Sequence, residues 1–72
     1  VLDWNLFNGL NKLVTLDLRA NKIRTIDRLV FNKNLIDLEA IYLSNNNLEE
    51  IIEYQFANLP KLSEIHLESN LI

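Results

Sequence analysis

The chain has 72 residues, of which 49% are hydrophobic and 24% charged, and it contains no cysteine. This length allows one small domain, and the lack of cysteine excludes disulfides, thiolate metal sites and a cysteine nucleophile. The net charge of −3 argues against nucleic acid as a ligand, because that binding depends on clustered Lys and Arg. No apolar run approaches the roughly 18 residues of a membrane-spanning helix, so we expect no membrane insertion by this segment.

The sequence repeats itself with spacings of 25 and 24 residues. Three aliphatic residues and one Asn recur in each copy at the same relative positions. A fixed period of this size indicates a solenoid, whose units stack on one another and do not fold alone. The equivalent residues are Leu13, Leu16, Leu18 and Asn21; then Leu38, Ile41, Leu43 and Asn46; then Leu62, Ile65, Leu67 and Asn70.

In chain order, residues 1–12 form a partial repeat that lacks a strand. Phe7 falls where Phe56 falls before the next copy, and Leu10 matches Leu59. Residues 13–37 and 38–61 are complete repeats, and residues 62–72 are a truncated one. We therefore expect a single segment of a longer array, without polar caps at its ends.

Each complete repeat is predicted to open with a short strand. Apolar and polar residues alternate with period two around Leu16 and Leu18, which places the leucines on one face and Asp17 and Arg19 on the other. The strand of the second repeat is predicted around residues 39–44. The Asn that follows each strand breaks the alternation, and the remainder of the repeat is too short for more than a turn of helix or 3₁₀ structure.

The repeated pattern LxxLxLxxNxLxxL, followed by Phe31 or Phe56, resembles the leucine-rich repeat. Its period is similar to that of the "typical" animal subclass of about 24 residues, found in Toll-like receptor ectodomains, small proteoglycans and secreted immune factors. The resemblance implies an α/β solenoid, a right-handed coil of about three repeats with a short parallel β-sheet on the concave face and a mostly irregular or 3₁₀ convex side. It also implies a non-enzymatic, extracellular or secreted module that recognises a protein or, alternatively, a glycan, without a cofactor.

One Asn in each repeat follows the strand, and we predict a structural ladder of Asn21, Asn46 and Asn70. Side-chain amides carry both donors and acceptors, so they can satisfy backbone groups that stacking would otherwise bury unpaired. Contact with a ligand is the alternative interpretation of these residues.

The predicted partner-binding site is the concave sheet face, because its side chains point to solvent from a rigid scaffold and are not constrained by the core. Tyr42 is the predicted anchor, since aromatic residues dominate the energetics of interfaces. If the strands stack in register, the face carries three rows: Thr15, Ala40 and Glu64; Asp17, Tyr42 and His66; Arg19, Ser44 and Glu68.

Two other interpretations remain open. The first is a structural spacer that holds flanking repeats at fixed curvature while ligand binds elsewhere. The second is a metal site around His66, because Glu64 and Glu68 alternate with it and Asp17 shares its row. We predict neither metal nor catalytic residues, since Cα atoms at i and i+2 lie nearly 7 Å apart and the single Gly leaves no oxyanion-hole loop.

The ends of the chain predict self-association. Leu2 and Phe7 at one end, and Leu67 and Ile72 at the other, lack a covering repeat, and edge strands present unpaired backbone groups. Residues 1–36 hold six Lys or Arg against three Asp, a net of +3, whereas residues 37–72 hold one Lys against seven acidic residues, a net of −6. We expect the isolated chain to associate through these ends, with opposite charge orienting neighbours head to tail.

Overall fold

The computed structural model describes residues 12–28, 30–31, 35–52 and 55–72. The partial repeat predicted for residues 1–12, with Leu2, Phe7 and Leu10, lies outside the described residues apart from Lys12.

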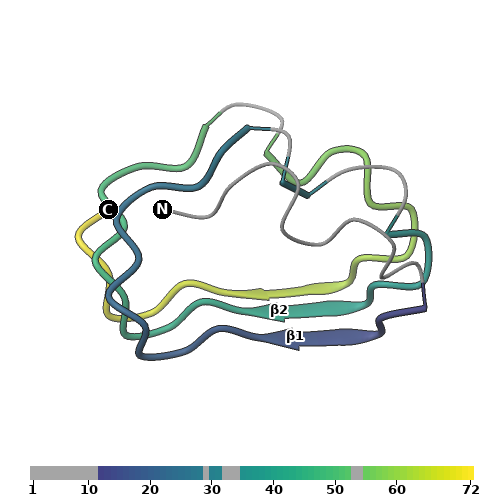
Figure 1. Ribbon diagram of the computed structural model, residues 1–72, viewed down its shortest axis with the longest axis horizontal. Coiled ribbons are helices and arrows are strands. Elements are labelled where there is room, and N and C mark those ends of the chain that lie inside the picture. Colours follow the sequence, from purple (N-terminus) through teal and green to yellow (C-terminus); the bar gives the residue numbers. More distant parts are fainter. Residues whose placement is uncertain (1–11, 29, 32–34, 53–54) are drawn as a thin grey trace.

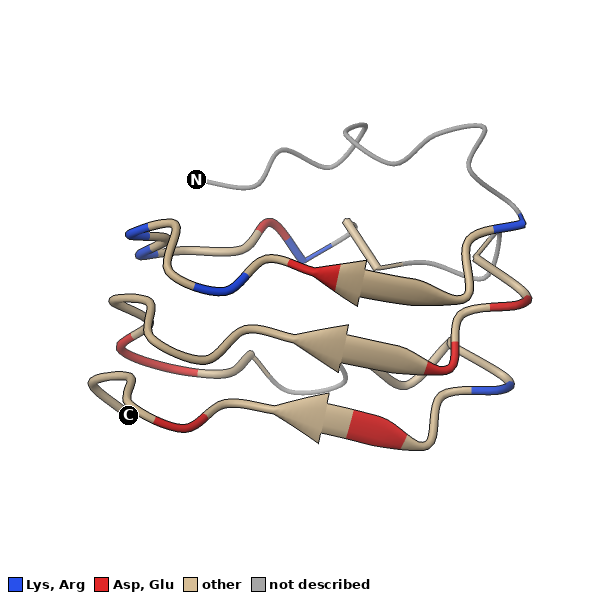
Figure 2. Ribbon diagram, turned by 90° about the horizontal axis from the view of Figure 1, so that it is seen from below, with Lys and Arg blue, Asp and Glu red and all other residues tan. Residues whose placement is uncertain are grey.

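Three short strands form one parallel sheet: β1 (Thr15–Asp17), β2 (Ala40–Tyr42) and β3 (Glu64–His66). Their order is β1-β2-β3, so strands that follow one another in the chain are also neighbours in space (Figure 2). The register pairs Leu16 with Ile41 and Ile41 with Ile65. The predicted parallel sheet is confirmed.

β2 is shorter at both ends than the predicted range of residues 39–44, although backbone pairing between repeats continues past the strands. The Leu18 amide donates to the Tyr42 carbonyl at 2.8 Å, and the Leu43 amide donates to the His66 carbonyl at 2.8 Å. The amides of Ala20 and Asn45 make one more such bond each, at 3.1 and 3.0 Å. The repeats are therefore joined over a longer stretch than the strand bounds indicate.

A residue in the left-handed conformation ends each of these pairings. Ala20, Asn45 and Ser69 occupy equivalent positions directly before the ladder Asn, with φ of 59°, 59° and 57°. Asn visits this region readily, whereas Ala and Ser do so at a cost of about 1–2 kcal/mol. The turn directs the next side chain toward the interior of the coil, where Asn46 is only 4% exposed. The sequence analysis did not find this turn, because Ala and Ser carry no signal for it.

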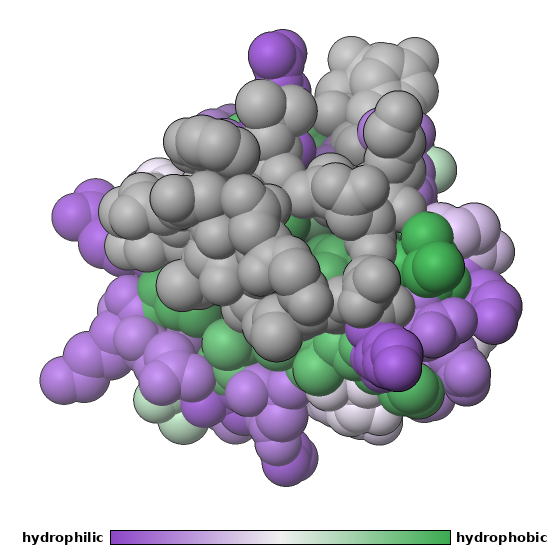
Figure 3. Space-filling view, turned by 45° about the vertical axis from the view of Figure 1, so that its right-hand side comes forward, coloured by the Kyte–Doolittle hydropathy of each residue, from purple (hydrophilic) through white to green (hydrophobic). Residues whose placement is uncertain are grey.

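Aliphatic side chains fill the space between the sheet and the segments that return along the opposite side of the coil (Figure 1). Leu38, Ile41 and Leu43 are completely buried, and each contributes about 1.5–3 kcal/mol through loss of apolar surface. The rings of Phe31 and Phe56 meet at 5.3 Å between centroids, so the equivalent Phe of successive repeats also stack. Where the described residues are visible in Figure 3, hydrophobic residues lie toward the inside of the view and hydrophilic residues form most of the rim.

The return segments contain no helix in their described parts. Single turns take its place: the Val30 amide donates to the Asp27 carbonyl at 3.1 Å, and the Gln55 amide donates to the Ile52 carbonyl at 3.0 Å. Segments this short cannot offset the cost of nucleating a helix. No helix among the described residues is long and apolar enough to cross a membrane.

β3 has one neighbour in the sheet, and its surroundings differ accordingly from those of β2. Ile41 of β2 is completely buried, whereas the equivalent Ile65 of β3 is 38% exposed. Leu71 and Ile72 beyond β3 are 66% and 64% exposed. Apolar surface is therefore accessible at this side of the stack.

Candidate functional site

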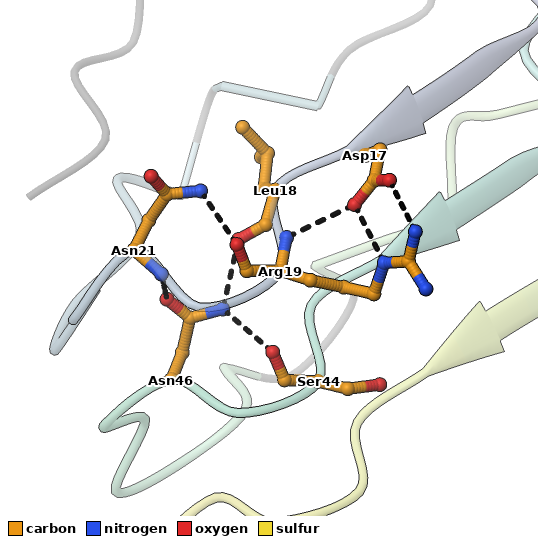
Figure 4. A network of polar contacts seen from close by, with 6 residues as sticks. All are labelled: Asp17, Leu18, Arg19, Asn21, Ser44 and Asn46. Carbon is orange, nitrogen blue, oxygen red and sulfur yellow. Dashed lines mark hydrogen bonds and ion pairs between the residues drawn. The ribbon is translucent and has the colours of Figure 1, made fainter.

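Asn46 forms a hydrogen-bonded rung between the first two repeats (Figure 4). Its Oδ1 accepts from the backbone amides of Asn21 at 2.9 Å and Ile23 at 3.0 Å. Its Nδ2 donates to the carbonyls of Leu18 and Leu43, both at 2.9 Å, and of Ser44 at 3.3 Å. One buried amide thus satisfies backbone groups in both repeats, which is the contact set that a structural ladder requires.

The other two ladder residues carry fewer such contacts. Asn70 Oδ1 accepts from the Leu48 amide at 3.0 Å, and its Nδ2 donates to the carbonyls of Leu43 at 2.9 Å and Leu67 at 3.0 Å. Asn21 is exposed, and its Nδ2 donates to the Arg19 carbonyl at 3.0 Å. The three positions are equivalent in sequence but differ in how much of the stack they hold together.

Gln55 makes a similar bridge on the return side, which the sequence analysis missed. It is 3% exposed, and its Nε2 donates to the Asp27 carbonyl of the preceding repeat at 3.2 Å. The sequence holds one sign of this bridge: Gln55 occupies, in the second repeat, the position that the apolar and buried Val30 occupies in the first. No buried side-chain nitrogen or oxygen in the described part of the chain lacks a hydrogen-bond partner.

The sheet register aligns two of the three predicted rows on the solvent-facing side of the sheet, here called the sheet face. Thr15, Ala40 and Glu64 are partners across the strands. Asp17, Tyr42 and His66 are partners in the same way. In the third row, Ser44 Oγ donates to Glu68 Oε2 at 2.7 Å.

Two residues of these rows offer little surface to a partner. Ala40 is 5% exposed and Ser44 is 8% exposed, although both belong to the predicted binding set. Ala40 is a small side chain on β2 with larger neighbours on both sides, Thr15 and Glu64, and Ser44, just past the end of β2, is hydrogen-bonded to the larger Glu68. The accessible part of the sheet face therefore consists of the other predicted residues.

Tyr42 lies at the centre of the sheet face between groups from both neighbouring repeats. Its ring stacks on the imidazole of His66, with centroids 4.7 Å apart and planes inclined by 15°. On the other side, Arg19 Cζ lies 5.5 Å from the centroid of the Tyr42 ring. These contacts line up three side chains across three repeats, and each is of a type that stabilises exposed aromatic residues modestly.

Asp17 and Arg19 form a bidentate ion pair on β1 and the residues after it (Figure 4). Arg19 Nη2 donates to Oδ2 at 2.6 Å, and Nε donates to Oδ1 at 2.9 Å. The side-chain hydrogen bonds from Arg19 lower the pKa of Asp17 from 3.8 to about 2, and the backbone amide of Arg19 acts in the same direction. This carboxylate is therefore already paired within the chain.

His66 lies between two carboxylates of its own repeat. Its Nε2 is 3.4 Å from Glu64 Oε1, and its Nδ1 is 3.4 Å from Glu68 Oε1. The hydrogen bond from Ser44 is the main cause that lowers the pKa of Glu68. No group of three or more His, Cys, Asp or Glu among the described residues is arranged to hold a metal ion, and Tyr42 lies between Asp17 and His66 in their row.

Two further ion pairs join repeats away from the sheet face. Arg24 Nη2 is 3.4 Å from Glu49 Oε2, and Lys61 Nζ is 3.1 Å from Asp37 Oδ1. All four side chains are well exposed to solvent, so these pairs contribute little to stability.

Comparison with known proteins identifies a family and relatives, two of which are given below. The sequence pattern of the family described as leucine rich repeat matches residues 13–72. Transforming growth factor beta activator LRRC33 of Danio rerio is 38% identical over 66 residues, which are 92% of this chain and 10% of that protein. Asporin of Bos taurus is 40% identical over 58 residues, which are 81% of this chain and 15% of that protein. The chain thus spans a small part of the length of these relatives, and no solved structure matches it.

Proposed function

The chain belongs to the leucine-rich repeat family, and we propose that it is a non-enzymatic recognition module that binds a protein partner through the sheet face. Its period and its stacked Phe residues fit the typical subclass of that family. We further propose that it works outside the cell, as the likeness to receptor ectodomains and secreted factors of that subclass implies.

The observation that carries this proposal is the position of Tyr42. Its partly buried ring is held from both sides, by His66 and by Arg19, yet it takes no part in the hydrophobic core. A rigid, amphipathic ring at the centre of an exposed face loses little conformational entropy when a partner covers it. The side chain of the ladder residue Asn46, in contrast, forms its hydrogen bonds with the backbone of two repeats.

The proposed choice of this face agrees with the coil that we expect for the chain. Connections between parallel neighbouring strands are right-handed in about 98% of cases, so we propose a right-handed coil of about three repeats with the sheet on its concave side. A concave sheet gathers side chains from several repeats around one ligand. The name of the Danio rerio relative describes an activator of a growth factor, which is an action on another protein.

The proposal can be tested by replacing Tyr42 with a photo-crosslinking derivative of phenylalanine in the full protein, as its own cells produce it. We expect a covalent adduct with a protein from position 42 and none from Arg28, an exposed residue on the return side. Tyr42→Ala should weaken binding of that protein by about tenfold or more, as loss of an interface anchor does, while Tyr42→Phe has a much smaller effect. Adducts with a glycan alone would mean that the ligand is a glycan and not a protein. Unchanged binding of the partner by Tyr42→Ala would favour the interpretation of the chain as a structural spacer.

We also propose that the isolated chain self-associates. Ile65, Leu71 and Ile72 expose apolar surface beside the edge strand β3, which has unpaired backbone groups on its outer side. In the described residues, basic side chains gather on the first repeat and acidic ones on the second and third (Figure 2). Light scattering should show a mass that rises with protein concentration, and a constant monomer mass would contradict this proposal.

A further inference from the structure

The sheet face changes in charge from β1 to β3. At β1, Asp17 and Arg19 neutralise each other through their bidentate contact. At β2, the outward residues Ala40, Tyr42 and Ser44 carry no charge. On β3 and just after it the outward residues include two carboxylates, Glu64 and Glu68, and within the described ranges neither forms an ion pair with Lys or Arg. A partner that covers the face therefore meets negative charge over the third repeat.

The imidazole of His66 cannot neutralise both carboxylates while it is uncharged. A neutral imidazole carries one N–H, so it can donate to Glu64 or to Glu68 but not to both. The two ring nitrogens each lie 3.4 Å from one of these carboxylates. With a neutral imidazole, one carboxylate therefore faces a ring nitrogen that offers it no N–H, and it has acceptor capacity for a donor from a partner.

Both carboxylates are accessible, and one of them is held in place. The side chains of Glu64 and Glu68 are 56% and 66% exposed. Glu68 Oε2 accepts the hydroxyl proton of Ser44 at 2.7 Å, which orients Glu68 toward the middle strand. The carboxylates thus flank the stack of Tyr42 on His66 and do not point away from it. A cation bound at either carboxylate would also lie beside the aromatic surface of this stack, which favours Lys and above all Arg.

We propose that the partner presents an extended segment with Lys or Arg side chains, which lie over β3 against Glu64 and Glu68 while an uncharged residue covers Tyr42. This inference rests on the proposed function and adds the chemistry of the partner. Charge complementarity carries it: among the described residues, the carboxylates at β3 have no Lys or Arg as an ion-pair partner, and Arg19 beside β1 is already paired with Asp17. An acidic segment or an anionic glycan would meet repulsion at β3.

The test uses two synthetic peptides of about six residues, roughly 20 Å when extended and long enough to cross the sheet. One alternates Arg with Ser, the other alternates Glu with Ser, and both have blocked ends so that only side chains carry charge. Binding to the protein is followed by NMR through the amides of β2 and β3 and the imidazole of His66. We expect the Arg peptide to shift these signals in a salt-dependent manner and the Glu peptide to leave them unchanged.

The matched variants are the double change Glu64→Gln with Glu68→Gln, and the single change Glu49→Gln as a control away from the sheet face. Glu49 is also an exposed carboxylate, and it is paired with Arg24. We expect the double variant to bind the Arg peptide about tenfold more weakly, because charge-assisted hydrogen bonds are lost, and the control to bind it as the parent does. Unfolding by urea shows whether each variant retains its fold.

Three results would overturn the inference: equal losses in the double variant and the control, tighter binding of the Glu peptide, or no binding of the Arg peptide to the parent. Binding of the natural partner separates this failure from failure of the proposed function. If Tyr42→Ala loses that partner and the double variant retains it, the sheet face binds but its partner is not basic. If neither variant loses it, both proposals are wrong.

Discussion

The rung at Asn46 and the sheet face at Tyr42 lie four residues apart in one repeat, and they use the neighbouring repeats in different ways. Asn46 is 4% exposed and binds backbone atoms of its own repeat and of the preceding one. Tyr42 is partly exposed and touches side chains, His66 on one side and Arg19 on the other. Backbone partners are present whatever the residue type of the neighbour, whereas side-chain partners change with every substitution.

The difference between backbone and side-chain contacts explains how one repeat can keep its stability while the residues on its sheet face change. Contacts to backbone depend on the stacking alone, so a rung of this kind works in every repeat that holds an Asn at its place. Contacts on the sheet face depend on the residues that each repeat happens to carry. Stability is thus expected to reside in the rung and the core, and specificity in the sheet face.

The largest expected effect is that of Asn46→Ala. This change leaves buried amides and carbonyls without partners, each at a cost of about 1–3 kcal/mol, so we expect a loss of about 3 kcal/mol or more in the free energy of unfolding. Asn70→Ala should cost less, and Asn21→Ala least, in the order of their hydrogen bonds. Urea denaturation of the three variants measures this order.

Tyr42→Ala, on β2 of the same repeat, is the control for the rung at Asn46. It removes a stacked ring from a partly exposed site, so a change of about 1 kcal/mol is expected. A loss for Asn46→Ala no greater than that for Tyr42→Ala would remove the distinction between the two regions.

The smallest expected effect concerns acid and the ion pair of Asp17 with Arg19. The pKa of Asp17 is lowered to about 2 in the folded chain, so the pair stabilises the fold above the ordinary carboxyl pKa of 3.8. That contribution is lost as the pH falls from 3.8 toward about 2, because the carboxylate then gains its proton in the folded state as well. We expect Asp17→Asn to show a shallower fall of the melting temperature over this range than the parent.

Arg19→Gln is the matched variant for this experiment, since it removes the other half of the pair. It should show the same shallower acid dependence as Asp17→Asn. High salt should reduce the difference from the parent, because both side chains are exposed. An acid dependence that the two variants leave unchanged would mean that the pair does not couple folding to protonation.

Much of the fold could be predicted from the period and the alternation of residue types. The spacing of Leu16, Ile41 and Ile65 gives the register of the sheet, and the alternation around them gives the inward and outward sides. Both properties follow from local backbone geometry, in which successive strand residues face opposite ways. The predicted site residues accordingly lie on one face, although their role in binding stays a prediction.

The exposure and the contacts of those residues depended on neighbours about one repeat away in the sequence. Ala40 and Ser44 are covered because larger side chains lie on both sides of them. A polar residue such as Gln55 would be expected to face solvent, but it is buried. Its side chain can be buried because it donates a hydrogen bond to a backbone carbonyl of the preceding repeat. No pattern within a single repeat carries this information.

By itself, the sequence determined the repeat, the parallel sheet and the division of each strand into an inner and an outer side. Each of these depends on a residue type recurring at a fixed spacing, which selects one backbone path and one stacking register. Only the tertiary structure decided the left-handed turns at Ala20 and Ser69, the pairing of Arg19 with Asp17 rather than with an acid of another repeat, and the placement of Glu64 and Glu68 on either side of His66. These features depend on which particular side chains meet across the stack, and that contact exists only once the repeats have assembled.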